Sequence, residues 1–294
     1  MSIFLGKSNT IADNTNLYLK KFFLKQKNNS SLLKPMKYGV FSGGKRFRSV
    51  IVANTGKIYG INYKKLIIIG AAIECMHSYS LIHDDLPSMD NDELRRGKLT
   101  VHKKFNEFTA ILAGNSLLTL AFEILSGKDL KLSNYYKNEL IKTLSECSGH
   151  RGLAGGQYFD LTFEKKNISK KNIIEMQRKK TGELFGFCCE SIAIIKGLDF
   201  KKRKKLKEMG INIGLLFQTV DDLIDYSGDS HTVGKPTKRD KKKGKATLVN
   251  LLGYKKTIIF ARDLKKKIDS EIKEYGYRSK DLLDSVAFII ERKF

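Results

Sequence analysis

The chain has 294 residues, of which 41% are hydrophobic, so it is long enough to bury a sizeable core. It contains three prolines, Pro35, Pro87 and Pro236, and no linker-like stretch, so we expect one domain over residues 1–294. The net charge is +24 and lysine outnumbers arginine 44 to 11, but these lysines are scattered, which argues against a nucleic-acid interface built from clustered arginines and exposed aromatic residues.

Apolar residues recur at three- and four-residue spacing along most of the chain, which predicts helices. Strand-like alternation is nearly absent. Gly43 and Gly44 precede one helical segment, and Ser126 and Gly127 end another. We therefore expect an all-α bundle with its site inside. The predicted helical segments are 11–24, 45–59, 64–85, 104–126, 133–150, 170–196, 201–227, 246–270 and 279–292.

The N-terminal residues lack a charged start followed by an apolar run, and no stretch approaches ~18 uninterrupted apolar residues. We expect a cytoplasmic protein without integral membrane association. The four cysteines show no metal-ligand spacing, so buried, reduced thiols are the expected state. They are Cys75, Cys147, Cys188 and Cys189.

A basic motif follows the first glycine pair. Lys45 and Arg48 lie one helical turn apart beside Gly43 and Gly44, an arrangement that can grip phosphate oxygens. Farther along, His77 lies seven residues before an acidic motif, which is two helical turns or ~10.5 Å. That separation suits a second anion, although a surface pair of cations and a core histidine are the ordinary alternatives.

The first acidic motif contains Asp84, Asp85 and Asp90 at the end of an amphipathic segment. Pro87 should end or distort this helix and so turn Asp90 back toward Asp84. Two adjacent arginines follow, which point in divergent directions and can serve two different diphosphates, or can simply lie on the surface. They are Arg95 and Arg96.

A second acidic motif places polar side chains on one helix face, with neighbouring Cβ atoms ~5–6 Å apart. Its members are Gln218, Asp221, Asp222 and Asp225. Divalent cations would resolve the repulsion between two such clusters, and magnesium suits carboxylates that share it with substrate phosphates. Zinc is disfavoured because no histidine and cysteine cluster is present, and His83 is expected to be structural.

Five motifs together resemble the short-chain trans-prenyl diphosphate synthases, and look most like the bacterial farnesyl diphosphate synthases. They are GGKRFR, SLIHDDLPSMDNDELRRG, GGQYFDL at 155–161, KTGELF at 180–185 and FQTVDDLID. The resemblance covers most of the chain. It implies a single-domain isoprenoid-synthase-like helical bundle with a central active-site cavity, in a homodimer.

The resemblance also implies three magnesium ions and two substrate sites. Two ions would be bound by Asp84, Asp85 and Asp90, and the third by Asp221 with Asp225. The isopentenyl diphosphate set is Gly44, Lys45, Arg48, His77 and Arg96. The allylic diphosphate set is Arg95, Lys180, Thr181, Gln218, Lys235 and Lys245, of which Lys180, Thr181 and Gln218 are the expected catalytic residues.

The implied reaction ionises an allylic diphosphate, lets isopentenyl diphosphate attack through its double bond, and ends with loss of a proton. Tyr79 and Ser80, about one turn before Asp84, are the expected chain-length residues. Tyr79 is bulky enough to block the tail of the growing chain beneath the first acidic motif, as the floor of the cavity. Farnesyl diphosphate is therefore the expected product. Ser49 and Asn115 depart from the pattern, where proline and aspartate are usual.

Other interpretations stay open at this stage. They are a geranyl or geranylgeranyl diphosphate synthase, a non-catalytic partner subunit of such an enzyme, a terpene cyclase, and a basic protein that binds nucleic acid or membranes. A cyclase does not need a second diphosphate pocket, and a partner subunit need not keep both acidic motifs complete.

Overall fold

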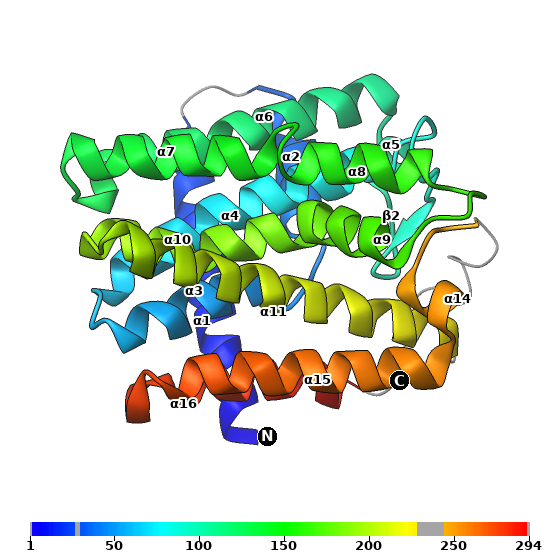
Figure 1. The fold of residues 1–294 in the computed structure, drawn as a ribbon. Coiled ribbons are helices and arrows are strands. Elements are labelled where there is room, and N and C mark those ends of the chain that lie inside the picture. The colour runs from blue at the N-terminus through cyan, green and yellow to red at the C-terminus, as the bar shows by residue number, and fades with distance from the viewer. Residues whose placement is uncertain (1, 27–29, 228–243, 293–294) are drawn as a thin grey trace. The chain divides into compact units, whose positions relative to one another are not determined.

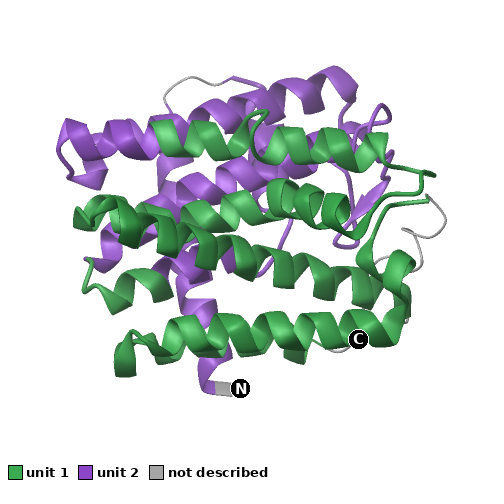
Figure 2. Cartoon of the chain, in the orientation of Figure 1, with its two compact units in different colours: residues 1, 54–61, 142–294 green, residues 2–53, 62–141 purple. Residues whose placement is uncertain are grey.

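The computed structural model describes residues 2–26, 30–227 and 244–292. The chain forms two compact units, which Figure 2 colours separately. The N-terminal unit comprises residues 2–53 and 62–141, and the C-terminal unit comprises residues 1, 54–61 and 142–294. The expectation of one domain stays a prediction.

The N-terminal unit is built around α4 (Tyr63–Asp84), which contacts α1, α2 and α6. Every residue from 66 to 76 is buried, as expected for a helix that is apolar on all sides. Its first turn is capped by Asn62, whose side chain accepts a hydrogen bond from the backbone of Lys64 at 3.0 Å. The neighbouring elements (Figure 1) are α1 (Ser2–Lys25), α2 (Leu33–Val40), α5 (Val101–Lys104), α6 (Glu107–Ser126) and the 3₁₀ turn η1 (Lys128–Leu130).

A two-stranded hairpin in this unit was not predicted. Strand β1 (Leu94–Arg95) pairs antiparallel with β2 (Lys98–Leu99). The connecting residues Arg96 and Gly97 both have positive φ, 54° and 72°, which is the pattern of a type I′ turn. Arg95 therefore lies in a strand and Arg96 in a turn, and their side chains diverge.

The C-terminal unit is organised around α11 (Phe200–Ser227), which packs on α10 (Glu183–Lys196) and α15 (Tyr254–Lys273). The predicted segment 201–227 agrees with α11 within one residue. Its other helices (Figure 1) are α8 (Leu153–Thr162), α9 (Lys170–Gln177), α14 (Leu248–Leu252), η3 (Gly276–Ser279) and α16 (Lys280–Glu291). Two further helices, α3 (Phe47–Ile58) and α7 (Asn134–Ser148), contribute residues to both units.

Two predicted helices are interrupted. The segment 170–196 contains a π-helical turn, η2 (Arg178–Gly182), between α9 and α10. The segment 246–270 breaks at Gly253, whose φ is 80°, so that α14 and α15 are separate helices. The helices α2 and α8 were not predicted, because 8 and 10 residues give too short a periodic pattern to be recognised.

Two helices are long and apolar enough to cross a membrane by length and composition alone, α4 and α6. The apolar window of α4 is 78% buried within the structure, whereas that of α6 is 44% buried. A buried core helix passes the same test, and α4 is such a helix. The expected absence of integral membrane association stays a prediction.

All four cysteines are free and buried, as the sequence predicted. Burial raises the pKa of Cys75 and of Cys189 to about 12. Since the thiolate is the reactive form, these side chains behave as small apolar core residues.

Candidate active site

The first acidic motif forms a tight turn at the end of α4. The helix ends at Asp84, and Pro87 follows in the turn, where the backbone N–H of Asp90 donates to the carbonyl of Asp84 at 2.9 Å. The expected return of Asp90 toward Asp84 is therefore present. It arises because proline cannot continue the helix and leaves the following backbone to find new partners.

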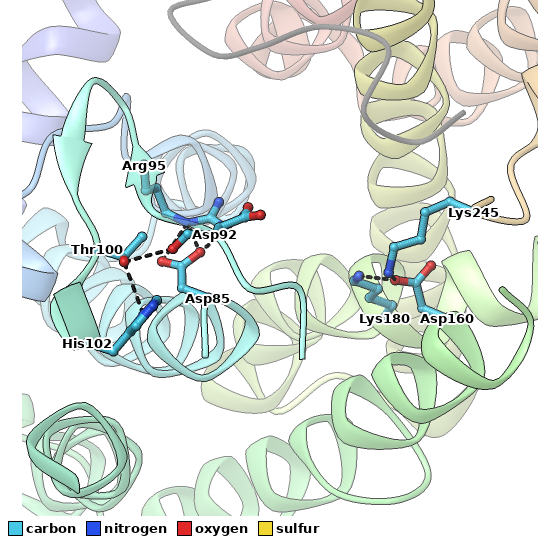
Figure 3. Close-up of polar contacts among 8 residues, drawn as sticks. All are labelled: Asp85, Asp92, Arg95, Thr100, His102, Asp160, Lys180 and Lys245. Atoms are coloured by element: carbon cyan, nitrogen blue, oxygen red, sulfur yellow. Dashed lines mark hydrogen bonds and ion pairs between the residues drawn. The ribbon is translucent and has the colours of Figure 1, made fainter. Parts of the chain in front are cut away.

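Asp85, between these two aspartates, is bound by an arginine. The Nε of Arg95 donates to both carboxylate oxygens of Asp85, at 2.7 and 2.9 Å (Figure 3). Asp92 lies 3.7 Å from the same guanidinium. Burial alone would lower the pKa of Arg95, but the hydrogen bonds and negative charge of Asp85 raise it. Asp85 thus fixes the direction of Arg95, and the negative charges of Asp84 and Asp90 act on the same guanidinium.

A buried hydroxyl and imidazole support the same hairpin. Thr100 donates to the carbonyl of Asp92 at 2.8 Å, and its hydroxyl lies 3.1 Å from Nδ1 of His102 (Figure 3). Burial lowers the pKa of His102, which keeps the ring neutral. The sequence analysis missed this network, because nothing in the spacing of a threonine and a histidine marks a contact with a turn eight residues earlier.

The basic motif divides into two parts. Arg46 is buried and donates to Asn16 at 2.9 Å, and it lies 3.6 Å from the buried Glu74. Ser49 completes this buried group, since its backbone N–H and hydroxyl lie 3.3 and 3.4 Å from the Glu74 carboxylate. A proline here would lack that N–H, so the departure at Ser49 has a structural role. Lys45, by contrast, is exposed just before α3.

Gly44 and Arg96, which the sequence assigned to one substrate, lie in contact. Arg96 donates to the carbonyl of Gly43. Gly44 has a φ of 112°, and a Cβ on it would lie 2.5 Å from a guanidinium nitrogen of Arg96. Only glycine combines this backbone angle with such a close approach.

His77 lies among positive charges. Burial lowers its pKa well below the usual value, and nearby arginines lower it further. Burial, together with the same arginines, also lowers the pKa of Arg96 to about 10. We name these arginines the arginine cluster: Arg46, Arg48, Arg95 and Arg96. Mutual repulsion of this kind favours binding of an anion, and the neutral imidazole is available as a hydrogen-bonding group.

In the second acidic motif, amides hold the buried acid. Asp222 accepts hydrogen bonds from the side-chain amides of Gln177 at 2.7 Å and Gln218 at 2.8 Å. Gln218 in turn accepts from the hydroxyl of Thr181 at 2.8 Å. The structure therefore joins Thr181 and Gln218, as expected for residues of one substrate site, and adds Gln177, which no sequence signal indicated.

The other two acids of this motif are only half-buried. Asp221 pairs with Arg292 at 2.6 Å, an arginine directly after α16. Asp225 lies one turn farther along α11. The predicted continuous polar face is therefore split, because Asp222 points into the unit and Asp221 with Asp225 lies at its edge.

Two lysines that are expected to bind the allylic diphosphate both contact the same aspartate. The ammonium groups of Lys180 and Lys245 each lie 2.7 Å from the same carboxylate oxygen of Asp160 (Figure 3). We call Lys180 and Lys245 the lysine pair. Asp160 belongs to the GGQYFDL motif but received no role from the sequence. Lys235 lies outside the described residues.

The expected chain-length residues lie on α4. The ring of Tyr79 packs edge-on against His83 with a centroid distance of 4.8 Å, and burial raises the pKa of Tyr79. Ser80 donates to the carbonyl of His77 at 2.9 Å. His83 lies 3.1 Å from the carbonyl of Ile111 on α6, which agrees with the structural role predicted for it.

Among the described residues, no three histidine, cysteine, aspartate or glutamate side chains form a group that could hold a metal ion by themselves. Asp84 and Asp90 are instead brought together by a turn. A pair of carboxylates suits magnesium, which takes oxygen ligands and usually shares them with substrate phosphates.

Comparison with known proteins identifies the family. The Polyprenyl synthetase family profile matches residues 29–278. The chain belongs to this family. Among curated relatives, farnesyl diphosphate synthase of Escherichia coli (strain K12) is 40% identical over 269 residues, which cover 90% of each chain. The enzyme of the same name from Haemophilus influenzae is 40% identical over 274 residues, with 91% of each chain covered.

Solved structures agree with this assignment. An FPP/GFPP synthase from Zymomonas mobilis matches with a TM-score of 0.86 and 36% identity, covering 98% of this chain and 100% of that one. A geranyltransferase from Helicobacter pylori, complexed with magnesium and isoprenyl diphosphate, matches with a TM-score of 0.83 and 31% identity over 98% and 96%. The predicted all-α, isoprenoid-synthase-like fold is confirmed.

Proposed function

We propose that the protein is a prenyltransferase that condenses isopentenyl diphosphate with dimethylallyl diphosphate and then geranyl diphosphate, to give farnesyl diphosphate. The observation that carries this proposal is the hydrogen bond from Arg96 to the Gly43 carbonyl beside Gly44, in the same unit as the acidic turn of Asp84 and Asp90. An anion site beside a carboxylate pair is what a two-diphosphate reaction needs, and the relatives named farnesyl diphosphate synthase support it.

In the first step, the bond between the allylic carbon and its diphosphate oxygen breaks, and the electron pair leaves with the diphosphate. Arg95 and the lysine pair would bind that diphosphate and stabilise the charge that develops on it. Asp85 orients Arg95, so the guanidinium does not need to reorganise during the step. The Thr181 hydroxyl, which donates to Gln218, and the Gln218 amide would place their dipoles near the reacting carbon.

In the second step, the double bond of isopentenyl diphosphate attacks the allylic cation, a carbon–carbon bond forms, and a proton leaves to the departed diphosphate. Gly44, Lys45, Arg48, His77 and Arg96 would hold isopentenyl diphosphate. Holding both substrates in place can contribute roughly 7–11 kcal/mol at best.

Magnesium fits the carboxylates of this chain. Asp84 and Asp90, with Asp85 beside them, would hold two ions, and Asp221 with Asp225 would hold a third. When bound, magnesium supplies positive charge to the leaving diphosphate. We take Asp84 and Asp90, whose backbones the turn joins, as the direct ligands, and Asp85 as the acid that holds Arg95.

The second candidate function is synthesis of a prenyl diphosphate of a different chain length. A dimethylallyltranstransferase of Fischerella ambigua and geranylgeranyl pyrophosphate synthase 4 of Arabidopsis thaliana are each 35% identical to this chain. We assign the floor to Tyr79, which His83 supports. We expect Tyr79→Ala to form a twenty-carbon product, because the smaller side chain removes the floor. Chromatography of the dephosphorylated products checks this, and an unchanged spectrum would contradict it.

The exposed face of α6 supports the proposed homodimer. Phe108, Ile111 and Leu112 are 66, 42 and 48% exposed and lie at one-turn spacing. Asn115 follows on the same face, where the usual aspartate would add a charge. We expect Phe108→Asp to shift the protein from dimer to monomer in light scattering after gel filtration. A wild-type protein of monomer mass would contradict this assembly.

The proposed reaction is tested by incubating the purified chain with magnesium, labelled isopentenyl diphosphate, and dimethylallyl or geranyl diphosphate in separate reactions. Farnesol from both, after dephosphorylation, is the expected product. An alcohol of another length would keep the enzyme class and overturn the assigned product. The absence of elongation with either starter would favour a non-catalytic partner subunit.

A further inference from the structure

The helix α8 has a buried face that carries polar side chains. Its buried residues are Leu153, Gly156, Gln157 and Asp160, which follow the spacing of a core face. Apolar residues are expected at such positions, yet Asp160 is a carboxylate with 7% exposure. A buried carboxylate is costly unless nearby cations compensate it.

The lysine pair compensates Asp160. Both ammonium groups lie 2.7 Å from Oδ2, and Lys245 also lies 2.9 Å from Glu164 in the turn that follows α8. Burial alone would raise the pKa of Asp160, but the charges of Lys180 and Lys245 outweigh burial and lower it. The carboxylate therefore stays ionised and holds two cations that would otherwise repel each other.

Gly156 makes this arrangement possible. A Cβ at Gly156 would lie 2.1 Å from the backbone nitrogen and 2.5 Å from the Cα of Lys180. The absence of that atom lets α8 approach the π-helical turn that contains Lys180 and Thr181. Asp160 lies four residues after Gly156 and so on the same face, where it reaches the Lys180 ammonium.

We propose that Asp160 is a positioning residue that holds Lys180 and Lys245 together as a preformed pair for the oxygens of one diphosphate. This inference rests on the proposed function, in which both lysines bind the allylic diphosphate. The shared Oδ2 atom of Asp160 holds the two ammonium groups next to each other, as binding to the oxygens of one diphosphate requires. Asp160 touches no substrate and acts through the lysines.

Glu190 provides a matched control. It is as buried as Asp160, at 6%, and it also binds two basic side chains of the same unit, Arg203 at 2.8 Å and Lys207 at 3.9 Å. Its partners lie at the junction of α10 and α11 and belong to no proposed substrate set. Asp160→Asn and Glu190→Gln therefore remove equivalent charges.

The decisive experiment measures binding of inorganic pyrophosphate, with magnesium, to the full chain by calorimetry. We expect Asp160→Asn to weaken pyrophosphate binding about tenfold or more, because the lysines lose a shared charged partner. Glu190→Gln should bind pyrophosphate as the wild type does. Equal affinity of wild type and Asp160→Asn, or an equal loss in both variants, would overturn the proposal.

A purely structural role makes different predictions. In Asp160→Asn, loss of the carboxylate lowers the pKa of the lysines, so the alkaline limit of pyrophosphate binding should move to lower pH. The effect of Asp160→Asn should also shrink in a Lys245→Met background, since one of its two targets is gone. An unmoved pH limit together with full additivity would refute positioning.

Two further measurements separate a loss of pyrophosphate binding from a loss of folding and from a failure of the proposed function. If Asp160→Asn loses its helical circular dichroism, Asp160→Glu replaces it, and the retained charge should preserve most of the pyrophosphate affinity. Failure of Asp160→Glu to rescue a folded protein's binding would count against the proposal. If the wild type binds pyrophosphate but does not elongate a substrate, the proposed function is wrong and the lysine pair remains a pyrophosphate site. If the wild type does not bind pyrophosphate, the role proposed for the lysine pair is wrong.

Discussion

The two units hold positive charge in different ways. In the N-terminal unit, Arg96 bonds to a backbone carbonyl, and burial with its arginine neighbours lowers its pKa to about 10. In the C-terminal unit, Lys180 and Lys245 share the carboxylate of Asp160. Arginine keeps its proton in the presence of other cations, while lysine loses its proton more readily when buried. Arg96 therefore keeps its charge beside other arginines, of which Arg46 and Arg95 pair with Glu74 and Asp85, whereas the two lysines share one acid.

The largest expected effect distinguishes Asp84, which we propose binds magnesium, from Asp85, which pairs with Arg95. Asp84→Asn should lower elongation by about 10³-fold and raise the magnesium concentration needed for half-maximal rate, because it removes a proposed ligand. Asp85→Asn should lower the rate through Arg95 but leave the magnesium requirement unchanged. Magnesium titrations of the rate check both.

If Asp85→Asn raises the magnesium requirement as much as Asp84→Asn does, Asp85 is a ligand as well. The proposed division of roles in the N-terminal unit, in which Asp85 holds Arg95 and Asp84 binds magnesium, would then be wrong.

The second prediction concerns the contact between Gly44 and Arg96. Gly44→Ala should lower kcat/KM for isopentenyl diphosphate about ten- to a hundredfold, because a Cβ displaces the guanidinium. Gly60→Ala is the matched control, since Gly60 also has a positive φ, 65°, but a Cβ there meets nothing within 4 Å. Steady-state kinetics and thermal unfolding of both variants separate loss of binding from backbone strain, and equal kinetic losses would contradict the prediction.

The smallest effect concerns His77 and stability. Its pKa is lowered in the folded state by burial and by the arginine cluster, so the unfolded chain binds a proton more readily below its usual pKa. Stability is therefore present above about pH 6.5 and is lost as the pH falls. Acidification to pH 5 should therefore destabilise the folded state through His77.

Denaturant unfolding of wild type and His77→Gln at pH 7.5 and pH 5 tests this expectation. The variant should lose less stability on acidification. An identical loss of stability on acidification in the two proteins would contradict the lowered pKa of His77. The arginine cluster would then have no measurable effect on His77.

Sequence alone predicted the helical fold and the family, because five motifs with fixed spacing carry both. It also predicted the turn after Asp84, since Pro87 determines it locally. Family membership and the all-α fold are confirmed, while the substrate roles of the individual residues stay predictions.

The partners of each acid could not be predicted. Asp85, Asp160 and Asp222 are all aspartates in motifs, but one binds an arginine, one a lysine pair and one two amides. These contacts join residues up to 85 positions apart, and no local pattern records them. The break at Gly253 was missed because apolar residues continue on both sides of it, and the π turn η2 because one additional residue leaves the chain helical.

The π-helical turn at Arg178–Gly182 has a consequence for how this chain tolerates change in length. A π turn carries one residue more than the α-helix that flanks it. Deleting one residue there would restore a regular helix, yet it would rotate Lys180 and Thr181 relative to α9 and separate them from Asp160 and Gln218. Insertions and deletions in this helix should therefore be selected against even where the helix itself would survive them.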